Sequence, residues 1–121
     1  MDKLDILGES STFELMVAYE DENLIFLRPN EILFMEKQDR KTILHTEKGK
    51  CESRKTLRYY ETKLEGEGFF RSHKSFLINL NKVDRCIPQI SYGYDVCFKN
   101  SNKTAEISRN RVKELRRRIN F

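Results

Sequence analysis

The side chains best suited to chemistry lie in one short stretch, FFRSHKSFLINLNKV, at residues 69–83. Arg71 and Lys74 carry positive charge, and His73 and the hydroxyls of Ser72 and Ser75 can hydrogen-bond a phosphate oxygen or a base edge. Apolar residues flank this polar centre, which predicts a core element, an exposed loop over residues 71–75 and a return to the core. The loop either presents donors to an anionic partner or is a solvated basic turn.

Basic residues are concentrated in one part of the chain, whose net charge is +4 over 121 residues. Residues 1–36 hold two basic and nine acidic residues, whereas residues 37–121 hold 21 basic and ten acidic residues. A basic field concentrates a polyanion such as nucleic acid or an acidic membrane surface, although many basic patches are only solvated faces. We therefore expect the partner to bind the positive part of the chain.

The sequence contains no motif of an enzyme or of a metal protein. The three cysteines, Cys51, Cys86 and Cys97, form no CxxC pair, and His45 and His73 do not supply closely spaced metal ligands. We find no nucleophile with its base, no carboxylate pair and no Gly-rich phosphate loop. These observations predict buried or half-buried free thiols, no metal or cofactor and no enzymatic activity, with His45 on a solvent-facing side of a strand.

The length of the chain predicts one folded domain. No apolar run approaches the roughly 20 residues that cross a bilayer, and the N-terminus, MDKLDILGES, lacks the basic and apolar regions of a signal peptide. We predict a cytoplasmic protein without a membrane segment. Residues 1–12 are predicted to be a tail or interdomain linker, and residues 13–121 the domain.

Alternating apolar and polar residues, and short apolar runs bounded by turns, predict short strands over most of the chain. In the first strand, residues 13–19, the alternation places Phe13, Leu15, Val17 and Tyr19 on one face, as in a half-buried strand. Pro88 indicates an edge strand or a bulge. We expect a polar loop at residues 36–41, a hairpin turn at 47–50, and further strands at 24–27, 32–35, 42–46, 83–90, 94–98 and 104–107.

Two helices are predicted. The first spans residues 54–65 after a Ser53 cap, with one apolar stripe formed by Leu57, Tyr60 and Leu64. Its other positions are mostly charged. The stripe therefore indicates packing against the core and not a ligand site.

The second helix follows Ser108, which we expect to cap it, and buries a stripe formed by Val112, Leu115 and Ile119. The helix dipole favours the cations of its last turn, but Arg109 and Arg111 lie at its positive start. Cations are disfavoured there unless an anion binds nearby. These two arginines therefore favour a binding function over a purely structural one.

In their order, these features resemble the LytTR family, the DNA-binding domain of many bacterial response regulators and of stand-alone regulators. The resemblance covers residues 13–119 and is carried by IFLRPNEILFMEK, TLRYYETKLEGEGFFRSHKSFLINLNKV, YDVCFKNS and AEISRNRVKELRRRI. It implies a mainly β fold: an elongated β-sandwich of several small, mostly antiparallel sheets with two short helices.

The resemblance also implies a function, sequence-specific double-stranded DNA binding by the output domain of a two-component transcriptional regulator. Loop side chains of the family enter major grooves, often on paired direct repeats. A receiver domain before this chain and a homodimer on DNA are further implied partners. The implied DNA-binding residues fall in three segments: Arg40 and Lys41; Arg71, His73 and Lys74; Arg109, Asn110 and Arg111.

Within these segments we expect two roles. Arginine can bond guanine bidentately and asparagine adenine, so direct readout is assigned to Arg40, His73, Asn110 and one of Arg109 and Arg111. Phosphate contacts are assigned to Lys41, Lys74, Arg116 and Arg117. Lys74 stands where some family members carry Asn, which replaces a base-reading amide with an ammonium.

Two other classes stay open. The same basic face could serve a protein- or membrane-surface interaction module without sequence-specific DNA binding. An RNA-binding β-domain ranks lower, because single-stranded RNA readers stack bases on exposed aromatic rings and most Phe and Tyr residues here fall on core-facing positions.

Overall fold

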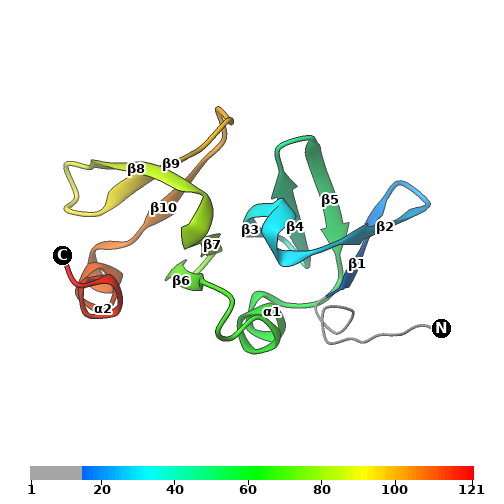
Figure 1. Ribbon diagram of the computed structural model, residues 1–121, viewed down its shortest axis with the longest axis horizontal. Coiled ribbons are helices and arrows are strands. Elements are labelled where there is room, and N and C mark those ends of the chain that lie inside the picture. Colours follow the sequence, from blue (N-terminus) through cyan, green and yellow to red (C-terminus); the bar gives the residue numbers. More distant parts are fainter. Residues whose placement is uncertain (1–14) are drawn as a thin grey trace.

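The computed structural model describes residues 15–121 (Figure 1). This part is mostly strand, with two α-helices, which confirms the predicted fold class. The strands are β1 (Met16–Glu20), β2 (Asn23–Leu27), β3 (Ile32–Gln38), β4 (Lys41–Thr46), β5 (Gly49–Ser53), β6 (Phe69–His73), β7 (Phe76–Asn79), β8 (Val83–Pro88), β9 (Tyr94–Phe98) and β10 (Thr104–Ile107). The helices are α1 (Leu57–Lys63), α2 (Val112–Ile119) and the short 3₁₀ helices η2 (Pro29–Glu31), η3 (Leu80–Lys82) and η4 (Arg109–Arg111).

The strands form two antiparallel sheets. One has the order β2-β1-β5-β4-β3-β7-β6 and the other the order β10-β9-β8. Along the long axis of the molecule, the β1–β2 hairpin lies at one end and the three-stranded sheet with α2 lies at the other (Figure 1). The edge position that Pro88 predicts for its strand is confirmed, because β8 is the outer strand of the second sheet. The predicted tail at residues 1–12 lies outside the described residues.

The three strands at the centre of the molecule are buried on both faces. On β3, Ile32 and Met35 join a cluster with the α1 residues, whereas Leu33 and Phe34 join a second cluster with β9, β10 and Leu115 of α2. The neighbouring strands β6 and β7 also contribute side chains to both clusters: Phe69 and Leu77 to the first, and Phe70 and Ile78 to the second. This two-sided burial explains why each of these strands contains consecutive apolar residues: Ile32–Met35, Phe69–Phe70 and Phe76–Ile78. Each fully buried large apolar side chain contributes about 1.5–3 kcal/mol to stability.

The first helix is shorter than predicted. Its N-cap is Thr56, whose hydroxyl accepts a hydrogen bond from the backbone N–H of Tyr59 (3.0 Å). Ser53, the predicted cap, instead ends β5, and its buried oxygen accepts a hydrogen bond from the Tyr60 hydroxyl (2.6 Å). The predicted stripe of Leu57, Tyr60 and Leu64 is confirmed, because all three are buried.

Two predicted loops are mostly strand. The polar loop expected at residues 36–41 is reduced to the turn Asp39-Arg40, in which Asp39 adopts a φ of 54°. The loop expected at residues 71–75 is reduced to the turn Lys74-Ser75, because β6 continues to His73. Ser72 is fully buried and donates a hydrogen bond to the Glu106 carbonyl oxygen (2.7 Å). Pairing with a neighbouring strand satisfies the backbone of these polar residues, so their polarity does not end the strand.

In the first strand, the buried face is not the one that carries most of the apolar residues. Met16 and Ala18 are 2% and 0% exposed, whereas Val17 and Tyr19 are 44% and 46% exposed. Alternation shows that a strand has two faces, but the position of the rest of the core decides which one is covered. Phe13 and Glu14 lie outside the described residues.

The C-terminal helix also differs from its prediction. Ser108 precedes the 3₁₀ helix η4 and makes no capping hydrogen bond with its side chain. In α2, Leu115 is buried and Val112 packs against the core, but Ile119 is 51% exposed. The strand expected to reach residue 90 ends at Pro88.

His45 lies between the two sheets and not on a solvent face. Its ring stacks on Phe34, with ring centroids 4.3 Å apart, and its Nε2 lies 3.0 Å from a Glu36 carboxylate oxygen. Nearby, the Lys103 ammonium on the β9–β10 loop donates to the carbonyl oxygens of Thr46 (3.1 Å) and Gly49 (2.6 Å). Burial lowers the pKa of His45, and the Lys103 charge lowers it further. Cys51, Cys86 and Cys97 are free thiols, as predicted. Cys51 is buried and Cys97 half-buried, but Cys86 is exposed, which corrects the prediction for that residue.

Candidate nucleic-acid interface

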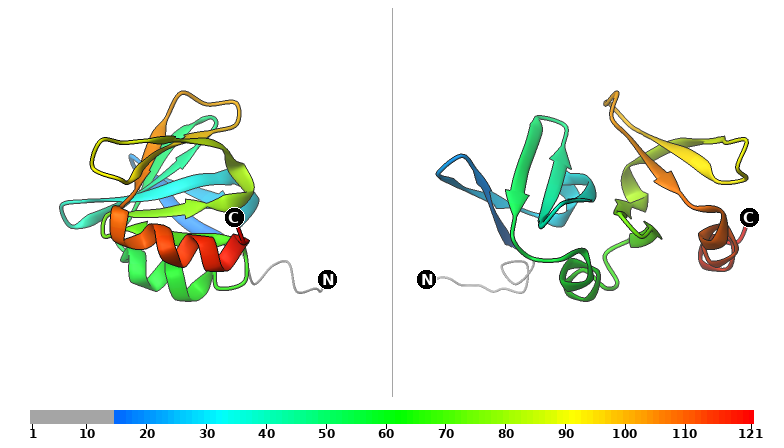
Figure 2. Two further views of the ribbon diagram at one scale, coloured as in Figure 1. Left: turned by 90° about the vertical axis from the view of Figure 1, so that its left-hand side faces the viewer. Right: turned by 180° about the vertical axis from the view of Figure 1, so that it is seen from behind.

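Three segments lie on one side of the molecule: the β3–β4 turn, the β6–β7 turn and η4 (Figure 2, left). Backbone hydrogen bonds fix their order. The Lys37 N–H donates to the Ser75 carbonyl oxygen (2.9 Å), which holds the β6–β7 turn against the end of β3. The Ser108 N–H donates to the Ser72 carbonyl oxygen (2.9 Å), which holds the start of η4 against β6. The β6–β7 turn therefore lies between the other two segments.

Two surface hollows join these segments. The first contains Arg40, Lys41 and Arg71, and the second contains Arg71, His73, Lys74, Asn110 and Arg111. Because Arg71 lines both, the hollows adjoin. The structure thus brings seven of the predicted site residues to one continuous surface, and Arg109, the eighth, is exposed beside Asn110 in η4.

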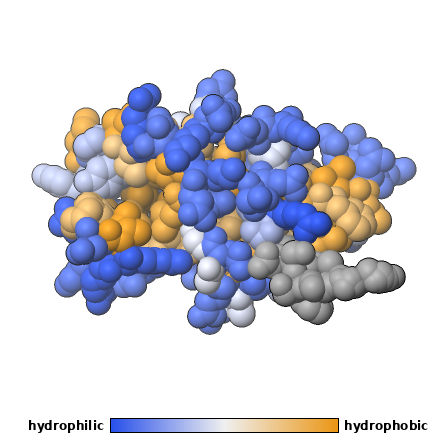
Figure 3. All heavy atoms as spheres, in the orientation of Figure 1, coloured by the Kyte–Doolittle hydropathy of each residue, from blue (hydrophilic) through white to orange (hydrophobic). Residues whose placement is uncertain are grey.

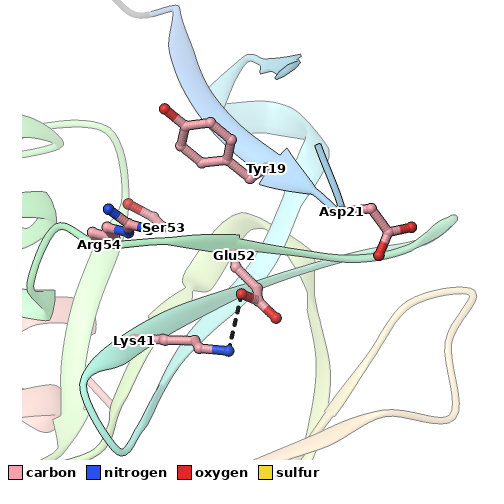
Figure 4. Close-up of a pocket in the computed structure, with 6 residues that line it drawn as sticks. All are labelled: Tyr19, Asp21, Lys41, Glu52, Ser53 and Arg54. Atoms are coloured by element: carbon pink, nitrogen blue, oxygen red, sulfur yellow. Dashed lines mark ion pairs between the residues drawn. The ribbon is translucent and has the colours of Figure 1, made fainter. Parts of the chain in front are cut away.

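Four of the predicted residues have exposed side chains at the tips of these segments: Arg40, Lys74, Arg109 and Asn110. Lys41 is also exposed, but its ammonium forms an ion pair with Glu52 on β5 (3.2 Å), at the edge of a separate hollow beside Tyr19 and Arg54 (Figure 4). An ion pair so exposed to water contributes little to stability. Lys41 can therefore exchange this partner for another anion at small cost.

Arg71 braces the central turn from within. Its guanidinium donates to the carbonyl oxygens of His73 (3.0 Å) and Lys74 (2.6 Å) and to the Glu61 carboxylate on α1 (3.2 Å). A planar guanidinium can form several such bonds at once because its donors point in fixed directions. Arg71 therefore shapes the turn that displays Lys74 and also ties it to α1.

Arg111 fastens the third segment to the second. Its Nε donates to the Arg71 carbonyl oxygen (2.9 Å), and its guanidinium lies 5.1 Å from the centre of the Phe70 ring. Arg118 lies 5.7 Å from the same ring. The contacts of Arg111 explain how this arginine is tolerated at the helix start, since a backbone carbonyl oxygen and an aromatic face supply negative potential. Arg109 is exposed to solvent.

His73 has one ring nitrogen already engaged. Its Nδ1 accepts a hydrogen bond from the Ser75 N–H (3.0 Å), and its ring meets Phe76 edge-on at 5.4 Å. An accepting Nδ1 places the proton of a neutral ring on Nε2. His73 is therefore oriented as a hydrogen-bond donor at the central turn.

Sequence reasoning missed several basic residues of the same surface. Lys37, Lys55 and Arg58 line the hollow of the β3–β4 turn, and Arg58 also shares a further hollow with Arg118 of α2. The charged positions of the first helix were visible in the sequence as its solvent face. Only the packing of α1 beside the β3–β4 turn and α2 shows that part of this face extends the basic surface.

Residues 15–121 include no helix long and apolar enough to cross a membrane. Within the same residues, no group of three or more His, Cys, Asp or Glu side chains is placed to hold a metal ion.

Comparisons with known proteins agree on one family. The model of the LytTr DNA-binding domain matches residues 22–120. The transcriptional regulatory protein YpdB of Escherichia coli K12 is 29% identical over 111 residues, which cover 92% of this chain and 44% of YpdB. The sensory transduction protein LytT of Oceanobacillus iheyensis is 28% identical over 102 residues, covering 83% of this chain and 42% of LytT. The chain thus spans less than half the length of these relatives.

A solved structure shares the fold. The LytTr DNA-binding domain of a Bacillus cereus response regulator superposes with a TM-score of 0.81 at 19% sequence identity, over 89% of this chain and 98% of that one. The two-sheet architecture described above is therefore that of a known DNA-binding domain.

Proposed function

The chain belongs to the LytTR family of DNA-binding domains, and from this premise we propose that it binds double-stranded DNA in a sequence-specific manner. One observation carries the proposal. Three exposed basic segments from distant parts of the sequence form a single row along one side of the molecule. A row of this kind suits a long polyanion with a regular groove better than a small ligand, because each segment can meet a successive part of the duplex.

We propose that the exposed tips read bases in the major groove. Arginine and asparagine side chains pair bidentately with guanine and adenine, each such pair discriminating by about 1–3 kcal/mol. The side chains assigned to readout are Arg40 in the first segment, His73 in the second, and Arg109 and Asn110 in the third. Asn110 already accepts a hydrogen bond from the Ser108 hydroxyl (2.7 Å), which orients its amide before DNA arrives.

Phosphate contacts supply affinity in this proposal. Lys41, Lys74, Arg116 and Arg117 are assigned to them, and all four are exposed. If about six phosphates are neutralised, log K falls against log salt with a slope near −5. The main role of Arg71 and Arg111 is to hold the second and third segments in position relative to each other. Their remaining N–H donors contact DNA.

The biological setting is also proposed from the family. We place the domain in the bacterial cytoplasm, as the output domain of a response regulator whose receiver domain lies in the part of the relatives that this chain does not span. Paired direct repeats are the expected DNA site, with two copies of the domain bound.

Selection of bound sequences from a randomised duplex pool at about physiological salt tests the proposal, because non-specific binding is already weakened there. We expect one short motif to be enriched. Asn110→Ala should then relax the preference at one base position and weaken the selected site by about 1–3 kcal/mol. Asn102→Ala, which removes an exposed asparagine on the β9–β10 loop outside the three segments, is the matched control. Recovery of unenriched DNA would refute the proposal and favour a surface-interaction module.

A further inference from the structure

The β8–β9 turn, residues 89–93, presents two large side chains to solvent. Ile90 is fully exposed and Tyr92 is 75% exposed, which makes them the two most exposed large hydrophobic side chains of residues 15–121. Figure 3 shows apolar atoms at the surface of this end of the molecule, on the left. Single exposed apolar residues are ordinary, so the conformation and the position of the turn decide whether these two have a role.

The backbone of the turn holds Tyr92 in a conformation that a large side chain does not favour. The Gln89 N–H donates to the Gly93 carbonyl oxygen (2.9 Å), and the Tyr92 N–H donates to the Gln89 carbonyl oxygen (3.1 Å). These bonds close a three-residue loop, and Tyr92, its last residue, has a φ of 73°. Glycine is the usual choice at this position of such a loop. A tyrosine kept there at a conformational cost, with little contact to the fold, indicates a binding role.

The turn packs directly against the third basic segment. A Cβ on Gly93 would lie 2.5 Å from the Ile107 carbonyl oxygen and 3.4 Å from the backbone nitrogen of Arg109. Glycine therefore lets the turn approach the start of η4 closely. The turn also projects to the same side of the molecule as the three basic segments (Figure 2, left). It thus continues their row beyond η4.

The chemistry of the turn differs from that of the three basic segments. Residues 89–93 carry no charge. The side-chain amide of Gln89 donates to the Asp95 carboxylate (2.8 Å), and the Ser91 hydroxyl donates to the Gln89 side-chain oxygen (3.1 Å). Polar groups at the base of the turn are therefore occupied within the hairpin, and Ile90 at its tip has none. In the major groove, the apolar group that a base pair exposes is the methyl group of thymine.

We propose that the β8–β9 turn is a fourth DNA-contact segment, in which Ile90 packs on a thymine methyl group beside the bases that Arg109 and Asn110 read. The Tyr92 ring packs against the adjacent DNA strand, and its hydroxyl donates to a phosphate oxygen. This contact rests on the proposed function and deepens it, because it assigns a preference for an A·T pair at one end of the site. Because the Ile90 contact is apolar, its contribution to affinity does not depend on salt.

Replacing thymine by deoxyuridine in the selected duplex tests the contact, because it removes only the methyl group. At one thymine next to the bases of the third segment, we expect deoxyuridine to weaken wild-type binding about fourfold, the factor for one buried methyl group. Ile90→Ala should weaken binding to the thymine duplex by about the same factor, leave the salt slope unchanged and make binding insensitive to deoxyuridine. Leu24→Ala, 55% exposed on the β1–β2 hairpin, is the matched control and should behave as wild type with both duplexes.

Tyr92→Gly separates a binding role from a structural one. Glycine adopts a positive φ without strain, so this variant should melt no lower than wild type. It should nevertheless bind the selected site about threefold or more weakly, because it loses the ring and the hydroxyl. A lower melting temperature with unchanged affinity would show that Tyr92 supports the fold and would overturn its assignment to DNA.

A tryptophan reporter tests the position of the turn without a known DNA site. The chain contains no tryptophan, so the fluorescence of a Tyr92→Trp variant comes from the turn alone. We expect it to be quenched by random duplex at low salt, where non-specific binding is strong. Phe26→Trp, exposed on the β1–β2 hairpin, is the control and should change little. Quenching at residue 92 no greater than at residue 26 would overturn the inference.

The outcomes distinguish this inference from the proposed function. If selection enriches a motif that wild type, Ile90→Ala and Tyr92→Gly bind equally, the fourth segment is refuted and sequence-specific binding stands. If selection enriches no motif, the proposed function is refuted, and the thymine contact with it.

Discussion

Replacing Arg71 tests whether this side chain builds the interface or only contributes charge to it. Two of its hydrogen bonds go to backbone carbonyl oxygens of the β6–β7 turn, and its pair with Glu61 is partly exposed, at 25% and 44% of the two side chains. Each backbone bond contributes about 1 kcal/mol and the exposed ion pair less than that. Arg71→Ala should therefore destabilise the fold by about 2 kcal/mol.

Thermal unfolding measures this loss. A change of 1 kcal/mol shifts Tm by roughly 4 °C in a domain of this size, so Arg71→Ala should melt about 8 °C lower. Arg71→Lys keeps the charge, but one ammonium cannot reproduce the guanidinium fork. We expect it to recover less than half of the loss. Lys74→Ala, in the same turn but exposed, is the control and should stay within about 0.5 kcal/mol of wild type.

DNA-binding measurements also distinguish a side chain that shapes the interface from one that only contributes charge to it. Lys74→Ala should reduce the slope of log K against log salt by about 0.9, the amount expected for one lost phosphate contact. Arg71→Ala should reduce the slope by at least as much and should weaken binding more than Lys74→Ala does, because it displaces the turn that presents both Lys74 and His73. If Arg71→Lys and Arg71→Ala both melted like Lys74→Ala, the assignment of Arg71 as a brace would be refuted.

Three further predictions concern the fold that carries the interface. Burial lowers the pKa of His45 below 6.5, so the unfolded state binds more protons. Stability should therefore fall as pH drops below about 6.5, and His45→Gln should flatten this profile in urea titrations. Protonation of His45 would place a second proton on its buried Nδ1, which has no hydrogen-bond partner among the described residues. Lys103→Met should cost about 2 kcal/mol by removing two hydrogen bonds to carbonyl oxygens, and should raise the pKa of His45 in NMR titrations, since the Lys103 charge lowers it. A Cβ on Gly93 would lie 2.5 Å from the Ile107 carbonyl oxygen, so Gly93→Ala should destabilise the β8–β9 hairpin by about 1–3 kcal/mol in urea titrations. A Gly93→Ala variant as stable as wild type would contradict the steric account.

Local patterns in the sequence were sufficient to predict whether most segments form strands or helices. The alternation of apolar residues predicted the strands, and the stripe of Leu57, Tyr60 and Leu64 predicted the buried side of α1. Their boundaries were less accurate, because a polar residue can continue a strand wherever a distant part of the chain satisfies its polar groups. Ser72 is the clearest case, since its hydroxyl donates to the Glu106 carbonyl oxygen of β10 and its own carbonyl oxygen accepts from the Ser108 N–H.

The sequence by itself determined the basic segments and the family resemblance, since charge and motif order are properties of the chain alone. The tertiary structure decided how these segments are arranged and what each side chain does. Arg71 and Arg111 look equivalent to Lys74 and Arg109 as charges, but packing directs their guanidinium groups toward backbone carbonyl oxygens. Tertiary packing also decided which face of β1 is buried, because a strand with apolar residues on both faces can bury either one, and the choice left Val17 and Tyr19 exposed.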